Sequence, residues 1–252
     1  MKIATWNVNS LKVRLAQVQD WLAEHQPDVL CLQETKTEDK NFPLAEIQQG
    51  GYEVVYSGQK TYNGVAILSK QAATDVQYGI PDFADEQKRV LAATINGVRI
   101  VCVYVPNGQS LDSDKYQYKL AWLNALQLWL KDELARYPKL ALLGDYNIAP
   151  EDRDVHDPAA WVGNVLVSEP ERAAFQELQN LGLRDAFRMF EQAEKSFSWW
   201  DYRMMGFRRN QGMRIDHILI SPALSCSSCS IDRAPRKLER PSDHTPVIAE
   251  IA

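Results

Sequence analysis

The chain has few cysteines, and this excludes a disulfide-stapled fold. Four occur among 252 residues, too few and too scattered for a framework of bridges. Cys31 and Cys102 lie in apolar, strand-like runs, where a thiol acts as a small hydrophobe. Cys226 and Cys229 have the spacing of half a zinc site, but no second pair or nearby histidine completes it. We therefore expect four reduced thiols and no zinc.

Long apolar runs and biased segments are also absent. No stretch has the length and hydrophobicity needed to span a bilayer, and the strand-like start at residues 1–7 lacks the apolar core of a signal peptide. A hydrophobic content of 45% and a charged content of 24% suit an ordinary globular protein, and no linker interrupts the chain. We expect a cytoplasmic protein with no membrane partner, a single domain over residues 1–252, and a monomer.

The chain also lacks an excess of positive charge. Its net charge of −5 argues against a protein that coats nucleic acid indiscriminately. The local charge differs, because residues 203–214 contain four arginines and no acid. The neighbouring segment 197–209 is aromatic and basic, a combination that suits neutralisation of a phosphate backbone and stacking on a distorted base step. The alternative is a loop that caps the core.

Strand-like runs outnumber helical ones. The runs are residues 3–8, 29–33, 52–57, 65–69, 90–95, 98–105, 140–143, 215–221 and 247–251, and the clearest helices cover 13–25, 116–137 and 169–181. Asn96-Gly97 between two strands predicts a hairpin, and Ser168 with Glu171 predicts a capping box at the start of the third helix. Antiparallel pairing within an α/β pattern predicts mixed sheets, two of them packed together with helices outside.

The most informative stretch, residues 142–150, is an apolar run that ends in Gly-Asp-x-Asn. It delivers polar side chains to the carboxyl edge of a sheet, where open α/β sheets keep their chemistry. In a strand Asp145 and Asn147 would point to the same side, so a carboxylate and an amide would converge. Such a pair suits a divalent cation, a polarised water or a phosphate oxygen.

Other strand ends carry similar residue types. These are Asn7 and Asn9, Gln33 and Glu34, Tyr104 and Asn107, Asp216, and Asp243 with His244. Hydrolysis of a phosphodiester needs a cation, a base and donors for the developing charge, and this set contains each of them. Taken singly, most would be read as caps or turns. Glu34, Asp145 and His244 are exceptions because each is exposed at the predicted sheet edge. The carboxylate partner of His244 is either Asp243 or Asp216, since adjacent residues in a strand point apart.

A series of motifs resembles one known family. They are Trp6-Asn7-Val8-Asn9, Leu32-Gln33-Glu34-Thr35-Lys36, Asn63-Gly64, Tyr104-Val105-Pro106-Asn107-Gly108, Gly144-Asp145-Tyr146-Asn147, Trp200-Asp201-Tyr202-Arg203, Arg214-Ile215-Asp216-His217 and Ser242-Asp243-His244. In this order they resemble the exonuclease III family of apurinic/apyrimidinic (AP) endonucleases, within the endonuclease/exonuclease/phosphatase superfamily. The resemblance implies a four-layered α/β sandwich with two packed mixed β-sheets flanked by helices.

It also implies an activity, hydrolysis of duplex DNA 5′ to abasic sites with Mg²⁺ or, as a substitute, Mn²⁺. Related activities are those of a 3′-phosphodiesterase, a 3′-phosphatase and a 3′→5′ exonuclease, all on blocked or terminal 3′ ends. The implied catalytic residues are Tyr104, Asp145, Asn147, Asp216 and His244, and the metal site draws on Asn7, Glu34, Asp145, Asn147, Asp243 and His244. The implied DNA contacts are Asn107, Trp200, Arg203, Phe207, Arg208 and Met213. Whether Asp145 or His244 is the general base stays open.

The sequence departs from the family near the substrate. Asn9 stands where some relatives carry Asp, and residues 155–170 match the family poorly. Because that stretch should lie near the pocket for the flipped-out sugar, an alternative is a 3′-end processing enzyme with little incision at abasic sites. A phosphoinositide, sphingolipid or RNA substrate is disfavoured by the aromatic, basic segment. A non-catalytic DNA-end-binding protein would not need the catalytic set.

Overall fold

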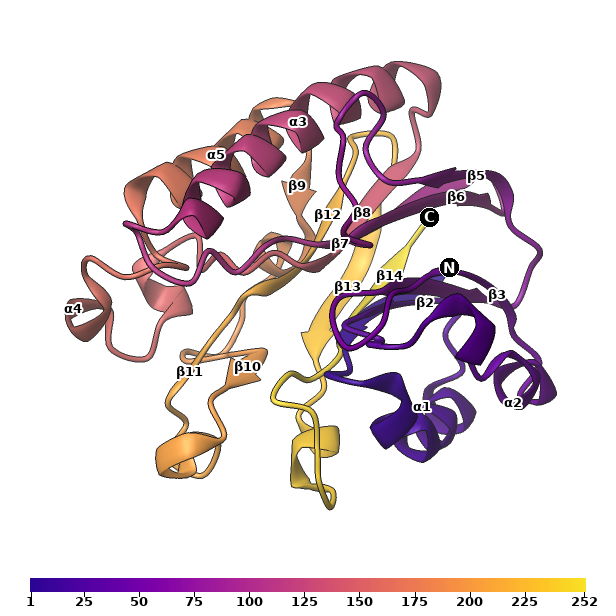
Figure 1. The fold of residues 1–252 in the computed structure, drawn as a ribbon, viewed down its shortest axis with the longest axis horizontal. Coiled ribbons are helices and arrows are strands. Elements are labelled where there is room, and N and C mark those ends of the chain that lie inside the picture. The colour runs from indigo at the N-terminus through magenta and orange to yellow at the C-terminus, as the bar shows by residue number, and fades with distance from the viewer.

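Two six-stranded sheets pack face to face, with helices on their outer faces (Figure 1). The computed structural model describes residues 1–252. The first sheet runs, in spatial order, through β13 (Cys226–Ile231), β14 (Val247–Ile251), β1 (Lys2–Asn7), β2 (Val29–Gln33), β4 (Val65–Ser69) and β3 (Glu53–Ser57). The second runs through β5 (Thr74–Tyr78), β6 (Val90–Ile95), β7 (Val98–Tyr104), β8 (Leu140–Asp145), β12 (Asp216–Ile220) and β9 (Arg184–Asp185).

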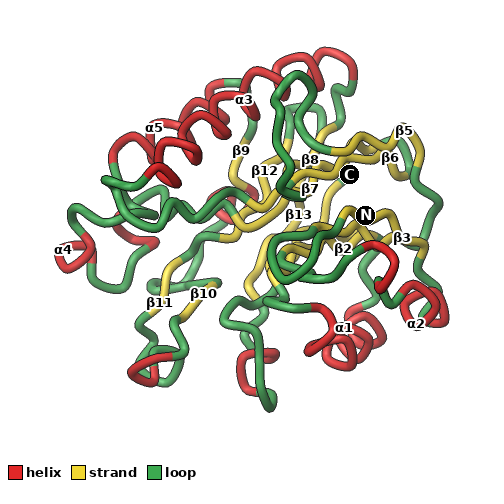
Figure 2. Tube along the Cα trace, in the orientation of Figure 1, coloured by secondary structure: helices red, strands yellow, loops and turns green.

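The helices form the two outer layers, so the predicted four-layered sandwich is confirmed (Figure 2). Helices α1 (Leu11–His25) and α2 (Leu44–Gln49) cover the first sheet, and α3 (Asp114–Arg136) and α5 (Glu169–Asn180) cover the second. The remaining elements are α4 (Pro158–Trp161), the two-residue strands β10 (Trp199–Trp200) and β11 (Gly212–Met213), and 3₁₀ turns at Asp39–Asn41, Asp152–Asp154, Ala186–Met189, Arg203–Met205 and Ala234–Lys237. No helix combines the length and hydrophobicity needed to cross a bilayer.

Three apolar cores hold these layers together. The largest lies between the two sheets and includes Cys31 and Cys102, whose thiols are free and buried as expected. A second core joins the outer face of one sheet to α3 and α5, and a third joins the other sheet to α1. The apolar runs in the sequence therefore belong to strands that are covered on both faces.

Local signals in the sequence correspond to local geometry. Asn96 and Gly97 have φ values of 50° and 78°, both positive as a type I′ turn requires, and the hairpin they close joins β6 to β7. Ser168 and Glu171 form the reciprocal capping box at the start of α5. Element bounds differ from the predicted ones by one or two residues, for example where α1 begins at Leu11.

Strand pairing brings several polar strand ends to one edge. The parallel register of β7 and β8 places Tyr104 beside Asp145, and the antiparallel register of β12 places Asp216 on the other side of Asp145. In the first sheet, β1 pairs in parallel with β2 and antiparallel with β14, so Asn7 lies near the residues that follow β2 and precede β14. Both sheets therefore contribute side chains to one region.

A buried ion network stabilises the second sheet below this edge. Arg214 is 1% exposed and pairs with Asp154 (Nε to Oδ1, 2.7 Å) and with Asp185 (Nη2 to Oδ2, 2.8 Å). Its Nη1 donates to Nδ1 of His217 (3.0 Å), whose Nε2 donates to the Ile148 carbonyl oxygen (2.8 Å). Arginine only donates, so this ring is the neutral tautomer protonated on Nε2. Burial, reinforced by the Arg214 charge, lowers the pKa of His217 to about 4.

This histidine should make the protein less stable in acid. The unfolded state binds its proton near pH 6.5 and the folded state only near pH 4, so the free energy of unfolding falls as the pH drops through this window. The loss due to His217 should be roughly 2–3 kcal/mol between pH 7 and pH 4.5. Urea unfolding at the two pH values measures it. His217→Gln keeps an acceptor and a donor but does not titrate, and should lose that much less stability; an equal loss in both proteins would contradict the assignment.

Candidate active site

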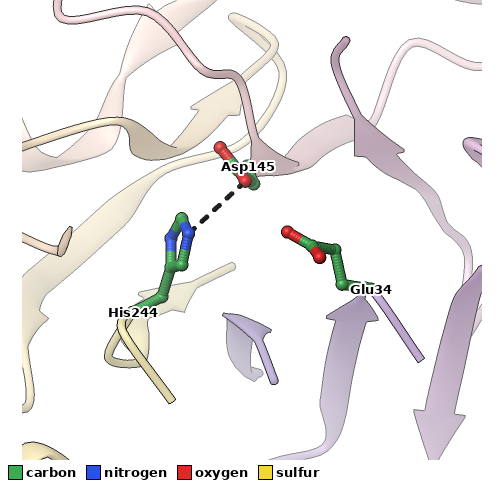
Figure 3. Close-up of side chains that lie close together, drawn as sticks. All are labelled: Glu34, Asp145 and His244. Atoms are coloured by element: carbon green, nitrogen blue, oxygen red, sulfur yellow. Dashed lines mark ion pairs between the residues drawn. The ribbon is translucent and has the colours of Figure 1, made fainter. Parts of the chain in front are cut away.

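Glu34, Asp145 and His244 converge at the shared edge of the two sheets (Figure 3). One ligand atom from each lies within 4.8 Å of the other two, and Nε2 of His244 lies 3.7 Å from Oδ2 of Asp145. Glu34 follows β2, Asp145 ends β8 and His244 precedes β14. The three residues that sequence reasoning singled out are thus brought together from three separate strands.

Asn7 connects the carboxylates of the two sheets. Its Nδ2 donates to Oε1 of Glu34 (2.8 Å) and to Oδ2 of Asp145 (2.8 Å), and the side chain is fully buried. Its Oδ1 accepts from the backbone N–H of Asn9 (3.0 Å). Both ends of the amide are therefore used: Nδ2 bridges the two carboxylates, and the Asn9 N–H fixes the orientation of the amide through Oδ1.

Asp145 and Asn147 do converge, but strand periodicity is not the reason. Strand β8 ends at Asp145, and Asn147 adopts a left-handed conformation with φ of 47°. Its backbone N–H donates to Oδ1 of Asp145 (2.9 Å), and its Nδ2 lies 3.3 Å from Oδ2. Asn107 donates to Oδ1 of Asn147 (3.1 Å). A turn stabilised by side chains therefore produces the predicted pair.

Asp216 is the carboxylate that holds His244. Nδ1 of His244 lies 2.9 Å from Oδ2 of Asp216 and 3.1 Å from Oδ1. Asp243 points elsewhere, where it accepts from Nδ2 of Asn9 (2.9 Å) and from Nε1 of Trp199 (3.1 Å). Of the two partners that the sequence left open for His244, the structure therefore selects Asp216, from another strand, over the adjacent Asp243.

Burial and neighbouring charges raise the pKa values of three groups in this site. Burial, with the nearby Asp216 charge, raises the pKa of Asp145 to about 7. Burial alone would disfavour a charged imidazole, but the Asp216 and Asp145 carboxylates outweigh it and raise the pKa of His244 to about 10. Burial also raises the pKa of the Tyr104 hydroxyl, as do Glu34 and Asp145. The edge thus offers a carboxylate that titrates near neutrality and two groups that hold protons.

The donor set suits a hard divalent cation. The Glu34 side chain is 17% exposed, and carboxylate and amide oxygens are the ligands that Mg²⁺ prefers. Burial would raise the pKa of Glu34, but Lys36, the hydrogen bond from Asn7 and the charge of His244 together outweigh it and lower this pKa; Nζ of Lys36 lies 2.9 Å from Oε2 of Glu34. The lowered pKa keeps the Glu34 carboxylate ionised, as a ligand of a divalent cation must be.

A family model described as "Endonuclease/Exonuclease/phosphatase family" matches residues 4–244. The chain belongs to this family. It is 37% identical to exodeoxyribonuclease III of Haemophilus influenzae over 99% of each chain. Two solved structures are similar, a 3′-5′ exonuclease (NExo) from Neisseria meningitidis (50% identity, TM-score 0.97, 99% of each chain) and an AP endonuclease from Archaeoglobus fulgidus (42% identity, TM-score 0.96, 99% of this chain and 98% of that chain). The protein is a hydrolytic DNA repair nuclease of a metal-dependent family, with DNA as its substrate.

Ser198 is a residue of this nuclease that sequence reasoning missed. Its hydroxyl donates to Oδ2 of Asp216 (2.6 Å) and accepts from the backbone N–H groups of Ile215 (3.1 Å) and Asp216 (3.0 Å). Its carbonyl oxygen accepts from the N–H of Thr245 (2.8 Å), next to His244. The side chain is fully buried. A serine beside two tryptophans carries no signal of this role in the sequence.

Removing this hydroxyl should affect catalysis more than binding. In Ser198→Ala, Asp216 loses a donor and two buried N–H groups lose their acceptor, so we expect a stability loss of about 1–3 kcal/mol. A looser Asp216 should lower kcat about tenfold, with KM within twofold. Steady-state kinetics on a nicked duplex and urea unfolding measure both effects. Ser198→Thr keeps the hydroxyl and should recover most of kcat, whereas an unchanged kcat in Ser198→Ala would contradict the role.

Two of the residues implied as DNA contacts are buried. Trp200 and Met213 are fully buried, so neither presents its side chain to DNA in this structure. Trp200 lies in β10 and packs edge-on against Phe207. Met213 lies in β11, which pairs with β10, and belongs to a small apolar cluster. Arg203 is well exposed and paired with Asp201. Asn107 and Arg208 are also exposed, and Phe207 is half-buried.

The loop beside them presents apolar side chains that the sequence analysis did not assign. Met204 and Met205 are 76% and 63% exposed. The loop extends from the β10–β11 hairpin, on the same side of the molecule as the segment before β14 (Figure 1). Exposed apolar side chains beside arginines are typical of surfaces that wedge against DNA.

Proposed function

We propose that this nuclease is a Mg²⁺-dependent phosphodiesterase, with Mn²⁺ as a substitute, that incises duplex DNA 5′ to abasic sites. It also acts on blocked 3′ ends as a 3′-phosphodiesterase, 3′-phosphatase and 3′→5′ exonuclease. We further propose that it works as a monomer and that residues 1–252 form one domain, because both sheets supply the site. The observation that carries the proposal is the convergence of Glu34, Asp145 and His244 from three strands.

We assign roles to these side chains from their contacts and charges. Glu34 would hold the cation, with Asn7 and Asp243 helping to shape the site, and the bound ion would neutralise charge on the phosphate. Asp145, with a pKa near 7, exchanges a proton with the attacking water or the leaving oxygen. His244 donates to a phosphate oxygen rather than serving as a ligand, because its raised pKa keeps both ring nitrogens protonated, with Nδ1 directed at Asp216.

Two more groups act on the phosphate in this scheme. Asn147 donates a hydrogen bond to charge that develops in the transition state, through the Nδ2 hydrogen that faces Oδ2 of Asp145 at 3.3 Å in this structure. Its other Nδ2 hydrogen stays on the Val105 carbonyl oxygen (3.0 Å) and sets its orientation. Tyr104 retains its proton, because its pKa is raised by burial and by neighbouring carboxylates, and binds a phosphate oxygen. The chain's own residues thus supply a base, three donors and the ligands.

A second candidate is a 3′-end processing enzyme with little abasic-site incision. The segment 155–170 contributes Leu166 and Trp161 to an apolar cluster with Met213 and Ile215, next to Asp216. Leu166 is 4% exposed and has a φ of 74°, a conformation that favours glycine. The side chain fills space beside the site that a flipped-out sugar would need. A 50% identical structure, moreover, is described as a 3′ phosphatase bound to a product DNA hairpin.

Cleavage of two labelled duplexes separates the two candidates. One carries an internal abasic analogue and the other a 3′-phosphate at a nick, and each is incubated with Mg²⁺ and with EDTA. Incision of the abasic duplex with Mg²⁺ but not with EDTA supports the AP endonuclease. Cleavage of only the second supports the 3′-end enzyme, and inactivity on both would reject the proposed function.

Leu166 provides a direct test of the occluded pocket. If its side chain excludes the flipped sugar, Leu166→Gly should raise the rate of abasic-site incision about tenfold or more, since about 1.4 kcal/mol of relieved hindrance is a factor of ten. The 3′-phosphatase rate should stay within twofold. Val162→Gly is the control, because Val162 is in the same segment but 79% exposed and outside the cluster. Equal rates for both variants would argue against occlusion by Leu166.

A further inference from the structure

The segment between β13 and β14 leads directly to His244 and has little secondary structure of its own. It contains a single 3₁₀ turn, Ala234–Lys237. The backbone carbonyl oxygens of residues 239–242 accept from no backbone N–H, yet each accepts from a side chain. The donors are Gln17 and Arg14 of α1, Tyr202 of the β10–β11 hairpin, and Arg236 of the segment itself. Side chains therefore determine the path by which this segment enters the site.

Two backbone hydrogen bonds join the end of this segment to β10. The Thr245 N–H donates to the Ser198 carbonyl oxygen (2.8 Å), and the Trp200 N–H donates to the Asp243 carbonyl oxygen (3.0 Å). Beyond this point no backbone hydrogen bond joins the hairpin to the segment. A ladder of this length is marginal by itself and needs further contacts.

Arg236 supplies contacts at the open end of this ladder. Its Nη1 donates to the Ser242 carbonyl oxygen (2.8 Å), and its Nη2 donates to the Trp200 carbonyl oxygen (3.3 Å). Its guanidinium carbon lies 5.1 Å from the centre of the Phe207 ring and 5.5 Å from that of Tyr202. The residue is only 6% exposed. A planar fork of donors suits this arrangement, and the single ammonium group of lysine does not reproduce it.

Ser242, which Arg236 holds, stands two residues before His244 and also contacts it. Its Oγ donates to the Asn7 carbonyl oxygen (2.7 Å) and accepts from the His244 N–H (3.2 Å). A rotation of the Ser242 backbone would therefore shift the imidazole, whose Nε2 lies 3.7 Å from Oδ2 of Asp145. A displacement of about 1 Å in such a group can lower a rate about 100-fold.

We infer that Arg236 is a positioning residue, which orients His244 by holding the Ser242 and Trp200 carbonyl oxygens together. Tyr202 assists it, because its hydroxyl donates to the adjacent Pro241 carbonyl oxygen (2.8 Å). The inference rests on the proposed function, in which His244 donates to a phosphate oxygen. The guanidinium bonds to backbone carbonyl oxygens and acts through the backbone. Its loss should therefore slow the chemical step more than it weakens duplex binding.

Two matched arginine-to-lysine substitutions test this on the nicked 3′-phosphate duplex. Arg236→Lys keeps a cation near the rings but loses the fork, so kcat should fall about tenfold with KM within about twofold. Arg233→Lys is the control, because Arg233 lies 5.2 Å from the ring centres of Trp200 and Phe207 but donates only to the Asn210 side chain. It should change neither quantity by more than about twofold. A raised KM with an unchanged kcat in Arg236→Lys would mean that Arg236 supports only the hairpin, and would overturn the inference.

A double-mutant cycle with His244→Asn shows whether the effect acts through the histidine. Without the imidazole, Arg236 has no group to orient. In single-turnover cleavage, Arg236→Lys should therefore lower the residual rate of His244→Asn by less than about twofold. Losses that multiply would overturn the inference while leaving the proposed function intact.

Tyr202→Phe tests the same anchoring if Arg236→Lys does not fold. It removes one hydroxyl from a side chain that is 51% exposed, so the fold should be retained. We expect kcat to fall about threefold, and this loss should also disappear in the His244→Asn background. An unchanged kcat in Tyr202→Phe, or a loss that persists without the imidazole, would contradict the inference. If the unmodified protein cuts neither duplex, the proposed function and the inference both fail.

Discussion

Asp145→Asn is expected to lower kcat by roughly 10²–10⁴-fold while duplex binding stays within a fewfold. The amide has nearly the same shape but cannot take or return a proton. It keeps one acceptor oxygen, for either Asn7 or the Asn147 N–H, which donate to different oxygens of Asp145. Asp145 is 1% exposed, and its burial is what raises its pKa to about 7, near the pH of the reaction. Single-turnover cleavage and fluorescence anisotropy with a labelled nicked duplex measure rate and binding separately.

Asp152→Asn provides the control, because Asp152 lies seven residues further along the same loop, is 72% exposed and pairs with Arg172. It should leave kcat within twofold. If Asp145→Asn weakened binding as strongly as turnover, the carboxylate would be holding the site together rather than moving a proton. An unfolding midpoint within a few tenths of a molar of urea would exclude misfolding as the cause.

Lys119→Met is expected to lower the free energy of unfolding by about 3–5 kcal/mol. Lys119 and Glu171 are completely buried and form an ion pair. Nζ of Lys119 also donates to the carbonyl oxygens of Asn147 (2.7 Å) and Asn107 (3.2 Å). Methionine matches the length of the stem but leaves the Glu171 carboxylate charged and unpaired in the interior. The two loops that carry Asn107 and Asn147 lose their shared donor as well, so activity should fall together with stability.

Urea unfolding compares this variant with Lys119→Met/Glu171→Gln. The second change removes the orphaned charge, so the double variant should regain part of the lost stability. Lys131→Met, on the exposed side of the same helix, should cost less than 0.5 kcal/mol or so, as surface changes usually do. A loss below about 1 kcal/mol in Lys119→Met would mean that water or a rearranged loop satisfies Glu171.

Much of the fold was predictable because its signals are local. Asn96-Gly97 specifies its turn through the φ values those residues tolerate, and Ser168 with Glu171 specifies a helix start through its own hydrogen bonds. The apolar runs predicted buried strands, because such runs are covered on both faces in packed sheets. The helix ends were less certain, since the last turn of a helix depends on neighbours outside it.

The tertiary structure decided the pairing within the site. His244 has Asp243 beside it in the sequence and Asp216 beside it in space, 28 residues away along the chain. Only the register of β12 against β8 determines which carboxylate reaches the imidazole. Ser198 shows the same limit more strongly, because its role comes entirely from where a two-residue strand places it.

Burial separated the residues that face a ligand from those that support the fold. Trp200 lies in the aromatic, basic segment 197–209, and Met213 and Arg214 follow it closely, yet all three are buried, and Arg214 pairs with two internal carboxylates. Amino-acid composition does not distinguish a DNA-contacting residue from a buried one, since the same aromatic and basic side chains serve in both roles.

The sequence by itself determined the types of the elements that it predicted, the Asn96-Gly97 turn and the Ser168 cap, and it singled out Glu34, Asp145 and His244, which the fold brings together. These follow from interactions over a few residues and from chemistry that each side chain carries anywhere. Only the tertiary structure decided which groups are partners, which are buried and which protons are held. Those properties depend on strand register and on packing between segments far apart in the chain, where a shift of one residue reverses the direction of every side chain.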